Sequence, residues 1–213
     1  MDQKLEITAL VLAGGKSTRM GRDKSRLRLG DKTLLERALE VVEPLCQEVV
    51  LVTAKGQSLD WLPGDHTFKS VQDLHPERGP LGGLYTGLKA SVTHYNLVVG
   101  CDTPFLNRCL LAFLAEQART YDAVVPMVHD RPQPLHAVYS QRCLEAADGL
   151  LSRKDAGLWD LLAAVNTKYV SQEEVARYDS HLTSFFNINT PSDLEEAERL
   201  LESRKQGTRN NEV

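Results

Sequence analysis

The strongest constraint on the fold of this chain is the alternation of short apolar runs with segments of helical period. The apolar runs are rich in β-branched residues and are nearly continuous, which is typical of strands covered by helices on both faces. Such alternation predicts an α/β fold with a mostly parallel sheet. The expected strands are Ile7–Leu12, Val49–Thr53, Phe68–Gln72, Leu97–Gly100 and Ala123–Pro126.

Four segments carry an apolar stripe at helical spacing. Thr33 and Glu36 predict a capping box at the start of the first helix, and Pro44 ends it. Thr190 is the expected N-cap of the last helix, with Pro191 at its first position. The stripes are Leu34, Leu35, Ala38, Leu39 and Val42; Leu84, Leu88 and Val92; Leu110, Leu111, Leu114 and Ala118; and Leu194, Ala197 and Leu201.

A length of 213 residues fits one domain. We expect that domain to span residues 1–203, followed by a flexible C-terminal tail at residues 204–213. The pattern is weaker from Gln133 to Tyr178, where Pro134–Tyr139 fits a strand and Asp155–Val165 fits a helix beginning near Ala156. Because no linker separates this region from the rest, we interpret it as an insertion or lobe on the same domain.

The charge balance excludes some classes of partner. Lys and Arg total 25 and Asp and Glu total 29, so the net charge is −4. A protein that binds nucleic acid through phosphate contacts usually carries a basic surface. Aromatic residues are only 6% of the chain, which also disfavours stacking on bases. We therefore expect no nucleic-acid partner.

Membrane and secreted locations are also disfavoured. The longest apolar runs, such as Ala9–Ala13, are far shorter than the about 20 residues that cross a bilayer. The first residues lead into a predicted strand without a secretory signal. We expect a cytoplasmic protein with no membrane partner and with reduced thiols in packing roles, since no C-x-x-C pair occurs. The cysteines are Cys46, Cys101, Cys109 and Cys143.

The segment from Leu12 to Lys24 is a glycine-rich loop directly after the first strand. An open α/β sheet places its ligand crevice at this end of its strands. Small residues let backbone N–H groups approach an anion, and nearby cations complete a phosphate cradle. The small residues are Ala13, Gly14 and Gly15, and the cations include Lys16, Arg19 and Lys24.

Two common phosphate-binding motifs do not fit this loop. A Walker A loop needs a glycine five residues before Gly15, but Leu10 stands there. The dinucleotide pattern Gly-x-Gly-x-x-Gly does not match the spacing of Gly14, Gly15 and Gly21. The competing interpretation is an ordinary βα turn with solvated charges.

Asp102 is the candidate metal ligand, because it follows a predicted strand and would emerge at the same sheet edge as the loop. Mg²⁺ prefers one or two carboxylates together with substrate phosphates. The alternative is a loop or N-cap aspartate. Asn187 and Asn189 bracket Ile188, so on an extended chain they point to one side, toward a metal or a substrate. Their alternative is local bonding around Thr190.

Histidines offer no separate metal site. His129 and His136 have no third ligand at a suitable spacing, so surface or core histidines are the simpler interpretation. The segment Gly79–Gly83 opens a predicted helix with little side-chain bulk. It could admit a purine ring close to the backbone, or it could form a plain helix-entry turn.

The string L-A-G-G-K-S-T-R-M-G-R-D-K resembles the signature of the molybdenum cofactor guanylyltransferases, the MobA family of nucleotidyltransferases. The resemblance continues through Arg78–Leu84, Gly100–Leu106, Gln133–Tyr139 and Phe186–Pro191. These blocks extend over nearly the whole chain. The resemblance implies a Rossmann-like, three-layer α/β/α nucleotidyltransferase fold of the GT-A-like kind.

Members of that family bind GTP with Mg²⁺ and join GMP to the phosphate of molybdopterin, releasing pyrophosphate. The resemblance implies GTP and molybdopterin as substrates, Mg²⁺ as cofactor, and transient contact with proteins that donate or accept the cofactor. It implies catalytic roles for Arg19, Lys24 and Asp102; nucleotide contacts for Leu12, Ala13, Gly14, Gly15, Lys24, Asp73, Gly79 and Asp102; metal binding by Asp102; and acceptor contacts for His136, Asn187 and Asn189.

Two alternatives remain open. One is a related transferase that uses CTP or another phosphorylated acceptor, although the Gly14-Gly15 pair resembles the guanylyl branch. The other is a nucleotide-binding regulator that has lost catalysis. A regulator would be expected to have a degraded site, whereas Arg19, Lys24 and Asp102 are all present.

Overall fold

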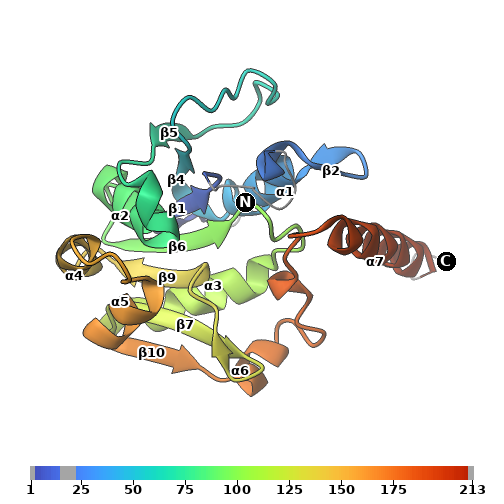
Figure 1. Cartoon of the computed structure of the whole chain (residues 1–213). Coiled ribbons are helices and arrows are strands. Elements are labelled where there is room, and N and C mark those ends of the chain that lie inside the picture. The colour runs from blue at the N-terminus through green and yellow to red at the C-terminus, as the bar shows by residue number, and fades with distance from the viewer. Residues whose placement is uncertain (1–2, 15–22, 211–213) are drawn as a thin grey trace.

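The computed structural model describes residues 3–14 and 23–210, with backbone alone for residues 205–210. Within this part of the chain, an eight-stranded sheet has the order β10-β7-β9-β6-β1-β4-β5, and β8 pairs with β7 (Figure 1). Pairing is parallel between β1 and β4, β1 and β6, β4 and β5, and β7 and β10, which confirms the mostly parallel sheet. The strands are β1 (Leu5–Leu12), β4 (Cys46–Thr53), β5 (Lys69–Gln72), β6 (Tyr95–Gly100), β7 (Ala123–Val128), β8 (Arg131–Pro132), β9 (His136–Ser140) and β10 (Thr167–Val170).

Helices cover both faces of the sheet, so the predicted three layers are confirmed (Figure 1). The central strand β1 shows why, because Ala9 and Val11 pack into one apolar cluster and Leu10 packs into the other. Successive residues of a strand point to opposite faces, and both faces of β1 are apolar. The first cluster contains α1 (Leu34–Val42), α3 (Arg108–Gln117) and α6 (Gln172–Ala176), and the second contains α2 (Gly79–Ala90), α4 (Cys143–Leu151) and α5 (Leu158–Ala164).

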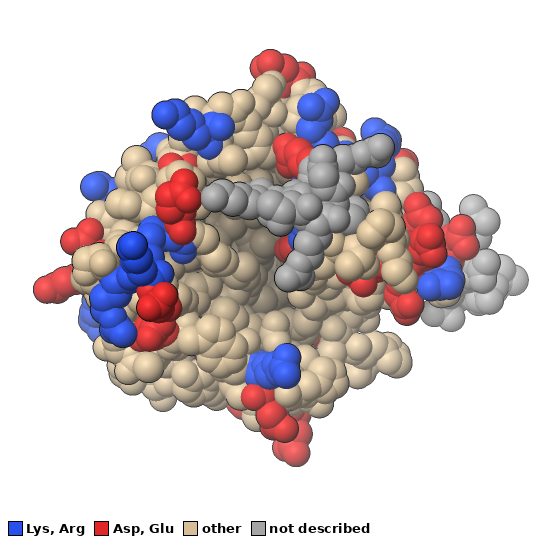
Figure 2. Space-filling model, viewed as in Figure 1, with Lys and Arg blue, Asp and Glu red and all other residues tan. Residues whose placement is uncertain are grey.

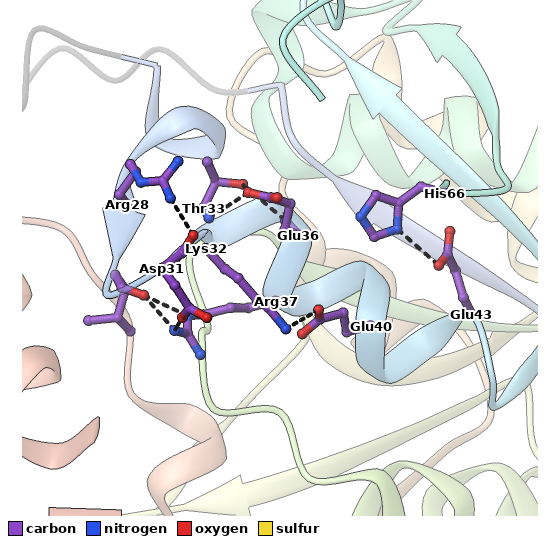
Figure 3. Close-up of polar contacts among 10 residues, drawn as sticks. Arg28, Asp31, Lys32, Thr33, Glu36, Arg37, Glu40, Glu43 and His66 are labelled. Carbon is purple, nitrogen blue, oxygen red and sulfur yellow. Dashed lines mark hydrogen bonds and ion pairs between the residues drawn. The ribbon is translucent and has the colours of Figure 1, made fainter. Parts of the chain in front are cut away.

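The hairpin of β2 (Arg28–Leu29) and β3 (Lys32–Thr33) leads directly into α1. The predicted capping box is confirmed, because Glu36 N donates to Thr33 Oγ1 over 3.2 Å and the Glu36 carboxylate accepts from Thr33 N over 2.7 Å. Arg37 donates from Nε to the Leu29 carbonyl over 3.0 Å, which ties the helix to the hairpin (Figure 3). These contacts fix the position of the part of the chain that follows Lys24.

The C-terminal helix α7 (Pro191–Asn210) packs beside this hairpin (Figure 1). A third apolar cluster joins the two, and the N-cap prediction at Thr190 is confirmed, because its Oγ1 accepts from Asp193 N over 3.2 Å. The helix continues to Asn210, past the boundary predicted at residue 203. The third cluster contains Leu29, Leu34, Phe105, Ile188 and Ala197.

Two sequence predictions about this fold are wrong. The helix α2 ends at Ala90, and Val92 lies beyond it with 77% of its surface exposed, so Val92 is not part of the apolar stripe. The region after Gln133 is not a lobe, because β9 lies inside the sheet and pairs antiparallel with both β6 and β7. The predicted helix near Ala156 begins two residues later, at Leu158.

The short 3₁₀ helices are η1 (Lys24–Arg26), η2 (Pro76–Arg78), η3 (Ala118–Thr120) and η4 (Thr183–Phe185). Of these, η1 begins a segment that lines the site described below, and η2 leads into α2, whose first turn lines the same site. Across the residues that the structure describes, no helix is both long and apolar enough to pass through a bilayer.

Candidate nucleotide-binding site

A cavity of about 250 Å³ lies where the carboxyl ends of β1 and β6 meet the start of α2. Figure 2 shows that this face of the molecule is hollowed, with mostly uncharged residues in the visible part of the hollow and charged residues around its rim. An open α/β sheet binds ligands at this edge of its strands. Six predicted site residues line the cavity: Leu12, Ala13, Gly14, Lys24, Gly79 and Asp102.

The first wall is the backbone that leaves β1. Ala13 N and Gly14 N both donate to the carbonyl of Val52, over 2.9 and 3.0 Å, so this segment runs close against β4. A Cβ on Gly14 would lie 2.7 Å from Ala54 N and 2.8 Å from the carbonyl carbon of Thr53. Only glycine therefore fits at position 14 without moving the backbone.

Lys24 provides the positive charge within this wall. Its ammonium donates to Asp102 Oδ2 over 3.1 Å and to Asn189 Oδ1 over 2.7 Å. The preceding Asp23 caps η1, because its Oδ1 accepts from Ser25 N over 3.0 Å. Local capping and two long-range contacts therefore hold Lys24 at the cavity.

Asp102 and Asn189 are held together through the main chain. Ile188 N donates to the backbone carbonyl of Asp102 over 2.9 Å. At the start of α7, Asn189 N and Thr190 N each donate to Asp193 Oδ2 over 2.8 Å. The bond from Asn189 N stabilises the carboxylate most and lowers the pKa of Asp193 below its usual value. This capping fixes the backbone from which the Asn189 amide reaches Lys24.

The opposite wall is the first turn of α2. Gly79 has φ +56°, a left-handed conformation that favours glycine. Its neighbour Arg78 donates to the carbonyl of Lys154 over 2.6 Å and to the carbonyls of Leu150 and Ala156 over 3.3 Å each. Arg78 also donates to the Arg153 carbonyl. The guanidinium therefore ties the entry of α2 to the end of α4.

Three predicted site residues, Asp73, Asn187 and His136, have surroundings other than the cavity. Asp73 accepts from His75 N over 2.8 Å and from Thr86 Oγ1 over 3.2 Å, which caps the turn after β5, and it is not among the described cavity-lining residues. Asn187 is exposed and donates to the Phe185 carbonyl over 3.0 Å. The two asparagines are thus not equivalent, because Asn189 alone of the pair contacts Lys24.

His136 lies in the core, as the simpler sequence interpretation expected. It is 2% exposed on β9, and its ring centroid is 4.5 Å from that of Phe185. Neither ring nitrogen has a hydrogen-bond partner among the described residues. Burial lowers the pKa of His136 to about 4, although Asp179 acts in the opposite direction. In this conformation the His136 ring is not exposed to an acceptor substrate.

The remaining two predicted site residues, Gly15 and Arg19, lie outside the described residues.

Several residues at the site were not predicted. Gln57 Nε2 donates to Asp23 Oδ2 over 2.9 Å and to Ser25 Oγ over 3.1 Å, and Ala54 N donates to its Oε1 over 2.9 Å. Gln57 therefore braces the segment around Lys24 against β4. No local pattern reveals this role, because Gln57 is 34 residues from Asp23. The other unpredicted lining residues include Val52 and Leu135.

The cysteine at the cavity is a packing residue. Cys101 is 6% exposed, and burial raises the pKa of its thiol well above the usual value. A thiol that stays protonated is a poor nucleophile. Burial likewise raises the pKa of Cys46 and of Cys143 to about 12, and all four cysteines are free. Packing roles for the buried thiols agree with the sequence expectation.

The donor set beside Lys24 suits an oxygen-liganded cation. The Asp102 carboxylate and the Asn189 amide oxygen both contact one ammonium group, so they already form a cation site of oxygen ligands. Oxygen ligands of this kind are what Mg²⁺ prefers. Among the described residues, no group of three or more His, Cys, Asp or Glu could hold a metal ion. A divalent ion held by these two groups would take its further ligands from water or from a substrate.

A small-residue loop after β1, a cation, and a carboxylate after β6 at one sheet edge define a nucleotide-binding α/β domain of the nucleotidyltransferase type. The chain belongs to the MobA-like NTP transferase domain family, whose model matches residues 9–173.

Comparison with individual proteins agrees with this family. The chain is 34% identical over 199 residues to a probable molybdenum cofactor guanylyltransferase of Natranaerobius thermophilus, covering 92% of this chain and 96% of the relative. It is similar to the crystal structure of molybdopterin-guanine dinucleotide biosynthesis protein A from Archaeoglobus fulgidus, with a TM-score of 0.80 and 30% identity over 92% of this chain and all of that one. A cytidylyltransferase from Thermus thermophilus shares the fold at 21% identity, with a TM-score of 0.66 over 92% of this chain and 98% of that one.

Proposed function

We propose that this protein transfers GMP from GTP to the phosphate of molybdopterin. One observation carries the proposal: Lys24 and Asp102 meet at a cavity bounded by the loop after β1, in a chain 34% identical to a named molybdenum cofactor guanylyltransferase. An oxygen of the molybdopterin phosphate attacks the α-phosphorus of GTP and forms a new P–O bond. The bond from the α-phosphorus to its bridging oxygen breaks, and pyrophosphate leaves with the electron pair.

The residues of the cavity have distinct tasks in this reaction. The backbone at Ala13 and Gly14 lines the cavity and would lie beside the nucleotide. The Lys24 ammonium binds the phosphates and offsets the repulsion between two approaching anions. Gly79 in the opposite wall, with its minimal side chain, leaves room for the base. Positioning and charge neutralisation supply most of the rate in phosphoryl chemistry.

Mg²⁺ dependence is part of the proposal. Asp102 would hold the ion together with the Asn189 amide oxygen, which contacts the same ammonium group, and the substrate phosphates would complete its ligands. When bound, Mg²⁺ would neutralise charge on the transferred phosphate. Arg19, for which the family resemblance implies a catalytic role in charge stabilisation, belongs to the same proposal.

The test is a pyrophosphate-release assay with each of ATP, GTP, CTP and UTP, with and without molybdopterin and Mg²⁺. We expect release only with GTP, molybdopterin and Mg²⁺ together. Release with CTP but not with GTP would overturn the choice of base. Nucleotide binding without release from any nucleotide would instead indicate a regulator.

The location and the protein partners are further parts of this proposal. We expect the reaction in the cytoplasm, with transient contacts to proteins that supply molybdopterin or receive the product. Cell fractionation and crosslinking of the full chain to such proteins would test these two points separately from the chemistry.

A further inference from the structure

Lys24 joins three parts of the chain that are far apart in the sequence. Its ammonium lies 3.1 Å from Asp102 Oδ2 and 2.7 Å from Asn189 Oδ1, across sequence separations of 78 and 165 residues. The Lys24 and Asp102 side chains are 19% and 25% exposed, so the ion pair is mostly shielded from solvent. Shielding makes such a pair stronger than one on the open surface.

This ion pair uses the carboxylate that the proposed function assigns to a metal ion. An ammonium group and a divalent cation repel each other, so both cannot bind one carboxylate oxygen at short range without a large energetic cost. No cluster of three ligating side chains among the described residues offers a second metal site. Lys24 and a divalent ion would therefore compete for the Asp102 carboxylate.

A nucleotide triphosphate changes this competition. The lysine side chain has a flexible stem and an ammonium that binds phosphate as a point charge. The Lys24 ammonium and Gly14 line the same cavity, so phosphates at the loop would attract the ammonium away from Asp102. Its departure would leave the Asp102 carboxylate and the Asn189 oxygen for a divalent ion.

We propose that Lys24 is an electrostatic gate that blocks the Asp102 metal site until nucleotide phosphates draw its ammonium away. This inference rests on the proposed function and deepens it by setting an order of binding, nucleotide before metal. The two ligands then bind with positive coupling, and each increases the affinity for the other. The gate keeps the carboxylate paired in the absence of substrate.

The test is Mn²⁺ binding to the protein without nucleotide, measured by the electron paramagnetic resonance signal of free Mn²⁺. Lys24→Met keeps the length of the stem and removes the charge. We expect Lys24→Met to bind Mn²⁺ about fivefold or more tightly than the wild type, within the usual range of coupling between sites. Adding Asp102→Asn to Lys24→Met should remove this gain, because the carboxylate is then absent.

The matched control is Lys32→Met, which removes a lysine from an exposed ion pair with Glu40 on the hairpin. Lys32→Met should leave the affinity for Mn²⁺ unchanged. If Lys24→Met does not fold, as judged by circular dichroism, Lys24→Gln replaces it in the same titration. An affinity for Mn²⁺ no higher than that of the wild type in a folded Lys24 variant would overturn the gate.

The failure of the gate and the failure of the proposed function are distinguishable. Pyrophosphate release by the wild type, with no gain of Mn²⁺ affinity in the Lys24 variants, would overturn the gate and leave the function standing. No pyrophosphate release from the wild type, together with the gain of Mn²⁺ affinity, would overturn the function and support competition at Asp102.

Discussion

At the scale of single residues, Gly14 has little room for change. Its missing side chain is what allows the loop after β1 to lie against Thr53 and Ala54, at contacts below 3 Å for an added Cβ. The neighbouring atoms are backbone, which cannot swing aside as the end of a long side chain would. The shape of this wall of the cavity therefore depends on the absence of a side chain at position 14.

Replacing Gly14 with alanine is expected to lower stability by about 1–3 kcal/mol, because an inserted methyl group forces a backbone shift. The shift should also weaken binding of GTP, since Gly14 lines the cavity. Urea unfolding and GTP titration measure the two effects. Gly64→Ala is the control, because a Cβ there meets nothing within 4 Å. Equal affinities for GTP in the two variants would contradict the prediction.

His136 makes stability depend on pH. Burial lowers its pKa from 6.5 to about 4 in the folded chain, so between these values the unfolded chain binds more protons. This contribution is complete above pH 6.5 and is lost as the pH falls toward 4. The lowered pKa corresponds to about 3 kcal/mol between pH 7 and pH 4.

We therefore expect His136→Phe to remove part of the acid sensitivity of folding. Urea unfolding at pH 7 and pH 4.5 should show a smaller loss of free energy in this variant than in the wild type. His129→Phe, on the loop between β7 and β8, controls for an exposed histidine. An identical loss in wild type and His136→Phe would show that His136 is not the titrating group.

At the scale of elements, Arg78 couples two helices on the same face of the sheet. Its guanidinium donates to four carbonyl groups between Leu150 and Ala156, where α4 ends. The last carbonyls of a helix carry partial negative charge and lack partners within the helix. The Arg78 side chain thus both satisfies carbonyl groups where α4 ends and fixes the turn at Gly79.

Arg78→Ala should lower the free energy of unfolding by about 2 kcal/mol, since hydrogen bonds from a charged donor are lost. It should also raise the Kd for GTP, because Gly79 and Pro80 line the cavity. Calorimetry of folding and GTP titration measure these changes. Arg142→Ala, at a more exposed pair with Asp122, is the control and should change neither quantity much.

Elements with a strong apolar pattern were predictable from the sequence. The six predicted strands and the five predicted helices all exist, with boundaries shifted by a few residues. The strand β10 was missed because it lies at the sheet edge and only Val170 of its four residues is buried. The place of β9 inside the sheet was missed because antiparallel pairing is set by its neighbours and not by its own pattern.

The site was predictable where the topology alone determines position. Gly14 and Asp102 follow neighbouring parallel strands, so they had to meet at one edge. Gln57 and Leu135 reach the site from loops whose paths no sequence period reports. The difference between Asn187 and Asn189 also depends on tertiary contacts, because only the position of α7 decides which amide reaches Lys24.

At the scale of the whole molecule, α7 holds the site together from outside it. Its buried Ala197 packs with Leu29 and Phe105, between the hairpin after Lys24 and the segment after Asp102. The same helix begins just after Asn189. Movement of α7 would therefore loosen both the hairpin and the amide that contacts Lys24.

Ala197→Asp places a charge in this cluster and is expected to cost about 3 kcal/mol or more. We expect a lower melting temperature and weaker GTP binding, measured by calorimetry and titration. Glu198→Ala, the next residue on the exposed side, should change stability by less than about 0.5 kcal/mol. Wild-type affinity for GTP in a folded Ala197→Asp would show that α7 does not support the site.

The contact between Lys24 and Asn189 also has a consequence for synthesis on the ribosome. The two residues are 165 positions apart, so at about 5–20 residues per second the ribosome needs about 10–30 seconds to translate from one to the other. Throughout that interval the nascent chain includes the loop after β1, and later Asp102, but it lacks the Asn189 amide that contacts Lys24. A chain interrupted before residue 189 therefore carries both charged groups of the site without the residue that aligns them.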